Sequence, residues 1–75
     1  MKTYTEDALL ALRDRHEAWL TAQAGVIGTG VGLDPSGQVV LRIFTKGIKQ
    51  ATRQAIAARL VGVPVAWEEG EVVAS

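Results

Sequence analysis

The chain has 75 residues, of which 48% are hydrophobic and 21% are charged, and its formal net charge is zero. These values predict one globular domain over residues 1–75 and disfavour a nucleic-acid-binding protein, which would be basic. Because cysteine is absent, disulfides and thiolate chemistry are excluded. No signal-peptide core or membrane-length apolar run occurs, so we expect a cytoplasmic protein with no membrane partner.

The first predicted element is an amphipathic helix that starts at a capping box formed by Thr3 and Glu6 and continues to about Gln23, before Gly25. One side of this helix carries an apolar stripe that consists of Ala8, Leu9, Leu12, His16, Trp19 and Leu20. Since His16 lies within the stripe, we expect it to pack in the core rather than act as a base or ligand.

Residues 25–44 predict a β-hairpin, with turn chemistry at residues 34–37. Alternation gives the first strand an apolar face and a nearly bare one, with Ile27, Thr29, Val31 and Leu33 on the first and Val26, Gly28, Gly30 and Gly32 on the second. Glycines at every second position indicate that a helix, a partner chain or a ligand approaches closely. Gly28, Gly30 and Gly32 are therefore candidate binding residues.

A second helix is predicted from about residue 48 to residue 60, and its alanine-rich side permits close packing on a sheet. A third strand then places Val63, Val65 and Trp67 on one face, and Pro64 favours an edge position. Residues 71–74 form an optional short fourth strand after the turn at residues 69–70.

This order, α-β-β-α-β(-β), predicts an α+β two-layer sandwich with two helices on one face of a mainly antiparallel sheet. It is similar to a ferredoxin-like fold without its first strand, whose place residues 71–74 or a neighbouring chain could fill. A short chain without disulfides also suggests a protein partner or self-association through a sheet edge. Pro64 and the glutamates at 68, 69 and 71 protect the last strand, so residues 25–33 are the expected joining edge.

Basic residues gather in the second half of the chain, because no acidic residue lies between Pro35 and Trp67. Lys46, Lys49 and Arg53 can share one side of the second helix's first turns and are a candidate anion or nucleic-acid site. The simpler interpretation is a solvated helix face.

No set of residues predicts catalysis, a cofactor or a metal site. Residues 28–32 lack the G-x-G-x-x-G spacing and are followed by a strand. Asp14 and His16 are two apart on a helix and do not face each other, and Ser36 belongs to a turn. The glutamates at 68, 69 and 71 have no histidine or aspartate beside them to complete a metal site. We therefore expect no enzyme, no cofactor and no metal.

His16, the run GVIGTGVG at residues 25–32, the run GVPV at residues 62–65 and Gly70 resemble a small bacterial domain found ahead of trypsin-like peptidase domains. The resemblance covers most of the chain and implies a non-catalytic role, propeptide-like or peptidase-associated. The expected function is therefore a protein-interaction module. The alternatives are anion or nucleic-acid binding through Lys46, Lys49 and Arg53, and small-ligand binding on the glycine-rich face.

Overall fold

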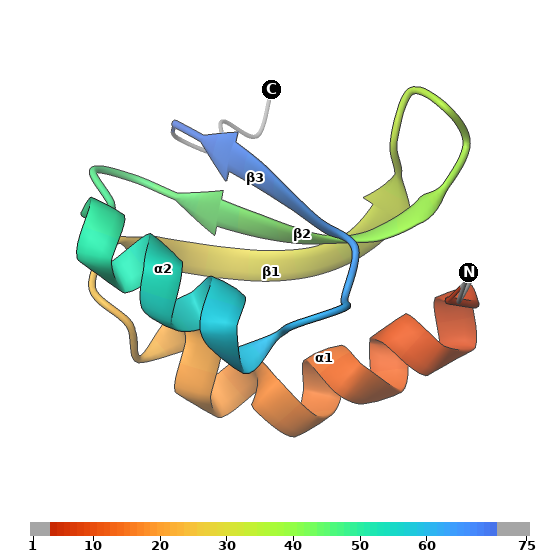
Figure 1. Cartoon of the computed structure of the whole chain (residues 1–75), viewed down its shortest axis with the longest axis horizontal. Helices are drawn as coiled ribbons and strands as arrows, with labels where there is room; N and C mark the ends of the chain where they lie inside the picture. The colour runs from red at the N-terminus through yellow and green to blue at the C-terminus, as the bar shows by residue number, and fades with distance from the viewer. Residues whose placement is uncertain (1–3, 71–75) are drawn as a thin grey trace.

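The computed structural model describes residues 4–70, which form two helices and a three-stranded mixed sheet (Figure 1). In chain order the elements are α1 (Glu6–Thr21), β1 (Val26–Leu33), β2 (Val39–Thr45), α2 (Gln50–Arg59) and β3 (Val65–Glu69). The predicted α+β class is confirmed. The optional fourth strand at residues 71–74 lies outside the described residues.

Helix α1 begins later than the capping box predicts. Thr5 is the N-cap, and its Oγ1 accepts a hydrogen bond from the N–H of Ala8 at 3.1 Å. The predicted cap, Thr3, lies outside the described residues. The helix ends at Thr21 rather than at Gln23, because the chain must turn before Gly25, whose φ of 90° sends it into β1.

Strands β1 and β2 pair antiparallel across the predicted hairpin. The N–H of Asp34 donates to the carbonyl oxygen of Gln38, and the N–H of Gly37 donates back to Asp34. The Asp34 carboxylate also accepts from the hydroxyl of Ser36 and from the N–H groups of Ser36 and Gln38. These bonds, led by the one from the Ser36 hydroxyl, hold the pKa of Asp34 below its usual value.

A β-bulge changes the predicted faces at the start of β1. Val26 pairs with Thr45 and Gly28 pairs with Phe44, so Ile27 is an extra residue in the ladder. Val26, which simple alternation places among the glycines, is therefore buried, and Ile27 is 49% exposed. The predicted faces of Val26 and Ile27 are both wrong, because the extra residue in a bulge interrupts the alternation of side chains.

The sheet has the order β1-β2-β3, and β2 and β3 are parallel, with Leu41 opposite Val65. The mainly antiparallel sheet is thus not observed, because α2 crosses back over the sheet and returns the chain in the direction of β2. The N–H of Leu41 donates to Pro64, so no space remains between these strands for a missing ferredoxin-like strand. The third strand also begins later than expected, at Val65.

One core fills the space between the sheet and the helices, which both lie on the same side of it (Figure 1). Its buried residues come from both helices and from β1 and β2: Leu20, Val26, Leu41, Ile43, Ile56 and Leu60. Helix α2 is shorter than predicted, with Lys49 as its N-cap, and it buries only Ile56 within its own length. Arg59 lies over the ring of Trp19 at 4.4 Å, which ties α2 to α1 by a cation–π contact.

We expect Gly25→Ala to destabilise the protein more than Gly37→Ala. The two glycines have similar φ values of 90° and 86°, so each alanine would cost about 1 to 2 kcal/mol for left-handed backbone. A Cβ on Gly25 would also lie 2.7 Å from the Cα of Ile48, whereas a Cβ on Gly37 would meet nothing within 4 Å. Urea unfolding of both variants measures the difference. Equal losses would contradict a rigid contact between Gly25 and the loop that carries Ile48.

Candidate functional site

The glycine row of β1 lies beneath two side chains of β2. A Cβ on Gly28 or Gly30 would lie 3.8 Å or 3.6 Å from the ring of Phe44, and a Cβ on Gly32 would lie 2.8 Å from the Nε of Arg42. This face points away from the helices, because the alternate residues of β2 face the core. The predicted close approach is therefore observed only at Gly32, where it comes from Arg42 of the neighbouring strand, whereas the distances at Gly28 and Gly30 are ordinary van der Waals contacts.

Arg42 of the central strand contacts residues of both edge strands on this face. Its guanidinium donates to the carbonyl oxygen of Leu33 at 2.9 Å and forms an ion pair of 3.5 Å with Glu68 on β3. Its Nε is buried and has no hydrogen-bond partner. A side chain at Gly32 would make the guanidinium shift, because a Cβ there would lie 2.8 Å from the Nε of Arg42.

The predicted basic patch is not one open cationic surface. Lys46 and Lys49 are exposed, but the guanidinium of Arg53 lies over the ring of Trp67, 5.1 Å from its centroid. The carboxylate of Glu69 lies at the same end of the sheet and is within electrostatic range of Arg53. Arg53 therefore interacts with both Trp67 and Glu69, and the three predicted basic residues do not share one environment.

Glu69 has a structural role that sequence analysis missed. Its carboxylate accepts the hydroxyl hydrogen of the fully buried Thr45 at 2.7 Å and the N–H of Gly47 at 2.9 Å. These bonds, Thr45 first, and the charge of Arg53 lower the pKa of Glu69. Its partners are 22 and 24 positions away in sequence, so no local pattern indicates them.

The backbone of β1 presents an open edge. In an antiparallel pair, residues alternate between those that bond to the partner strand and those that point away from it. The N–H of Asp34 bonds to Gln38, so Asp34 is one of the residues that face β2. By alternation, the even-numbered residues of β1 from Gly28 to Gly32 also bond to β2. The N–H and C=O groups of Thr29, Val31 and Leu33 therefore point outward, where no described strand pairs with them.

Side chains along this edge are uncharged and partly apolar. Val26 to Leu33 contains no charged residue and no proline. Ile27 and Leu33 are 49% and 56% exposed, and they are two of the three large hydrophobic side chains exposed within residues 4–70. The opposite edge, β3, follows Pro64 and carries Glu68 and Glu69, which discourage strand pairing.

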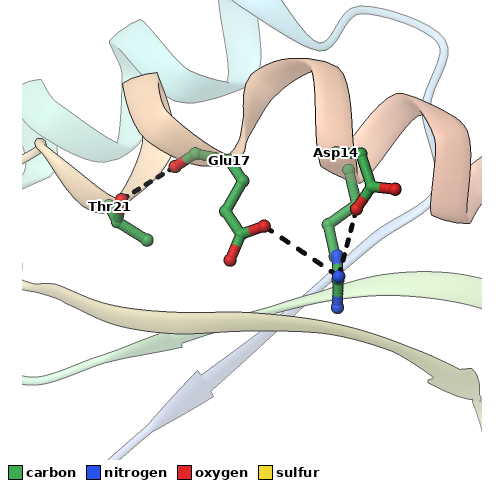
Figure 2. A network of polar contacts seen from close by, with 4 residues as sticks. Asp14, Glu17 and Thr21 are labelled. Carbon is green, nitrogen blue, oxygen red and sulfur yellow. Dashed lines mark hydrogen bonds and ion pairs between the residues drawn. The ribbon is translucent and has the colours of Figure 1, made fainter.

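The residues considered for catalysis have other partners or no common location. Asp14 pairs with Arg13, and Glu17 lies 3.9 Å from the same guanidinium, as Figure 2 shows. The hydroxyl of Thr21 in this view donates to the carbonyl oxygen of Glu17. Ser36 belongs to the hairpin turn, and His16 is half-buried on α1. Within residues 4–70, no three His, Cys, Asp or Glu side chains gather as metal ligands would.

These features define the chain as a small α+β domain whose sheet has one helix-covered face and an open, uncharged edge at β1. Comparison with protein-family models, curated proteins and solved structures found no match. Neither α1 nor α2 is long and apolar enough to cross a membrane.

We expect the stability of the domain to fall in acid through Glu69. Because hydrogen bonds lower its folded-state pKa below the unfolded value, its contribution is complete above the unfolded pKa and is lost as the pH falls through the folded pKa. Glu69→Gln should weaken this part of the pH dependence of the unfolding free energy, measured by urea titration at several pH values. Asp34→Asn is the comparison variant, because Asp34 is the other carboxyl whose pKa is lowered by hydrogen bonds. An unchanged pH profile in Glu69→Gln would contradict the assignment.

Proposed function

We propose that the protein is a non-catalytic protein-interaction module that binds its partner by adding a strand to the edge of β1. The observation that carries this proposal is the outward row of main-chain groups at Thr29, Val31 and Leu33 on an edge strand of eight uncharged residues, in which the carbonyl oxygen of Leu33 also accepts a hydrogen bond from Arg42. An unpaired edge without charge or proline is the kind that recruits another strand. Main-chain hydrogen bonds supply affinity in this mode of recognition, and side-chain contacts supply specificity.

The two faces beside this edge support the same proposal. On the outer face the glycines leave little side-chain volume beside an added strand. On the helix side, Val31 packs against the core and Leu33 leaves apolar surface uncovered. A strand with alternating apolar residues would cover that surface, since the alternate side chains of a strand point to one face.

A propeptide-like or peptidase-associated role is part of this proposal, and its support is the resemblance of residues 25–32 and 62–65 to domains that precede trypsin-like peptidases. Propeptides and their peptidases can associate without any catalytic group on the propeptide. An extended segment of such a peptidase would be one strand of the required kind.

We expect Val31→Pro to abolish strand addition without removing a hydrogen bond of the β1–β2 ladder, because the N–H of Val31 points outward. Phage-displayed random decapeptides are selected against the native domain and then tested by fluorescence anisotropy. The matched control is Val65→Pro, since Val65 is also half-buried and stands on the other edge. Selected peptides should lose binding to Val31→Pro and retain it for Val65→Pro.

Amide hydrogen exchange locates the bound peptide. We expect new protection at Thr29 and Val31, whereas Gly30 should already be protected by its bonds to β2. Failure to select any peptide, or peptides that bind Val31→Pro as well as the native domain, would contradict the proposed function.

A further inference from the structure

The open edge of β1 is not electrically neutral over its whole length, because Arg42 reaches it from β2. The N–H of Asp34 points toward β2 and bonds to Gln38. The C=O of Leu33 belongs to the same planar trans peptide and therefore points the opposite way, out of the edge. Since the guanidinium of Arg42 donates to this oxygen at 2.9 Å, it crosses β1 above Gly32 and ends at the open side.

The guanidinium of Arg42 retains capacity for another partner. Of its five N–H donors, the Nε hydrogen is buried, Nη2 uses one to bond to Leu33, and Nη1 faces Glu68, so the remaining capacity lies on the two Nη atoms. The ion pair with Glu68 is 3.5 Å long and partly exposed, with 38% and 47% of the two side chains accessible. A carboxylate arriving at the end of the edge could therefore bond to the guanidinium without displacing the contact to Leu33.

We propose that the occupant of the β1 edge is an extended segment of another protein that carries an acidic side chain beside Arg42. This inference rests on the proposed function and names the chemistry of the partner. The apolar side of the added strand would face Val31 and Leu33, and its carboxylate would lie on the outer face, where Arg42 lies. The acidic residue is expected from charge complementarity with Arg42. Because β1 itself has no charged residue, Arg42 is the charge that the added strand would meet at this edge.

A second copy of the chain fits this edge less well. Its β1 has no acidic residue to offer, so a symmetric pair would bring each Arg42 to an uncharged strand. The β3 of a second copy has carboxylates, but Glu68 is paired with Arg42 and Glu69 is bonded to Thr45 and Gly47.

Steric crowding also opposes symmetric pairing. Helix α1 packs mainly against β1 and less against β2. Two paired β1 strands would lie about 5 Å apart, whereas the axes of two packed helices need about 8 to 10 Å. An extended segment has no helix to accommodate. Self-association through β1, which the sequence predicts, is therefore the alternative that the experiments below must distinguish from binding of an extended segment.

The test uses two synthetic decapeptides of alternating valine and threonine that differ at one central threonine position, which is aspartate in the first and lysine in the second. Fluorescence anisotropy on the full chain should show tighter binding of the aspartate peptide, by up to about five-fold for a partly exposed ion pair. Arg42→Gln should abolish this preference, and Arg42→Lys should retain it. Equal binding of both peptides to the native chain, or a preference that survives in Arg42→Gln, would overturn the inference.

Sedimentation equilibrium without peptide separates this inference from the proposed function. A monomer across the concentration series is expected. A dimer that is lost in Val31→Pro would overturn the extended-segment inference and leave strand addition at β1 standing. Monomers that bind neither peptide would contradict both. If Val31→Pro fails to fold by circular dichroism, Leu33→Pro serves instead, because its N–H also points outward at the end of β1.

Discussion

Strand β2 lies in the middle of the sheet and organises the other elements around it. Its odd-numbered residues bond to β3, as the N–H of Leu41 does to Pro64, and its even-numbered residues bond to β1. The side chains of Leu41 and Ile43 are fully buried beneath both helices. Because β2 has strands on both sides, its polar backbone is satisfied, and the open hydrogen-bonding groups of the described sheet fall on β1 and β3.

The outer side chains of β2 explain the composition of β1. Phe44 and Arg42 lie over the neighbouring strand, and the approach is tight only at Gly32, where a Cβ would lie 2.8 Å from the Nε of Arg42. The same arrangement carries a positive charge to an edge that has none of its own. The packing of the outer face and the charge at the β1 edge therefore both depend on Arg42, whose guanidinium lies over Gly32.

Polar contacts supplement a small core in this chain. Helix α2 is rich in alanine and buries a single residue within its length, so it contributes little apolar area. The guanidinium groups of Arg53 and Arg59 cover Trp67 and Trp19, and Glu69 joins the end of β3 to the loop before α2. Of the three residues in the predicted basic patch, Arg53 is thus engaged in packing, whereas Lys46 and Lys49 are exposed.

The elements whose signals are local could be predicted from the residue pattern. The apolar stripe of α1 has the helical period, Asp34 and Gly37 supply the turn chemistry, and alternation from Thr29 to Leu33 assigns the faces of β1 correctly. The bulge at Ile27 and the direct parallel pairing of β2 with β3 depend on contacts between strands, which no local residue pattern indicates. The partners of the long side chains could not be predicted from the sequence either. Arg42, Arg53 and Glu69 reach partners that are distant along the chain, and a residue pattern specifies where such a side chain starts but not where its charged end lies.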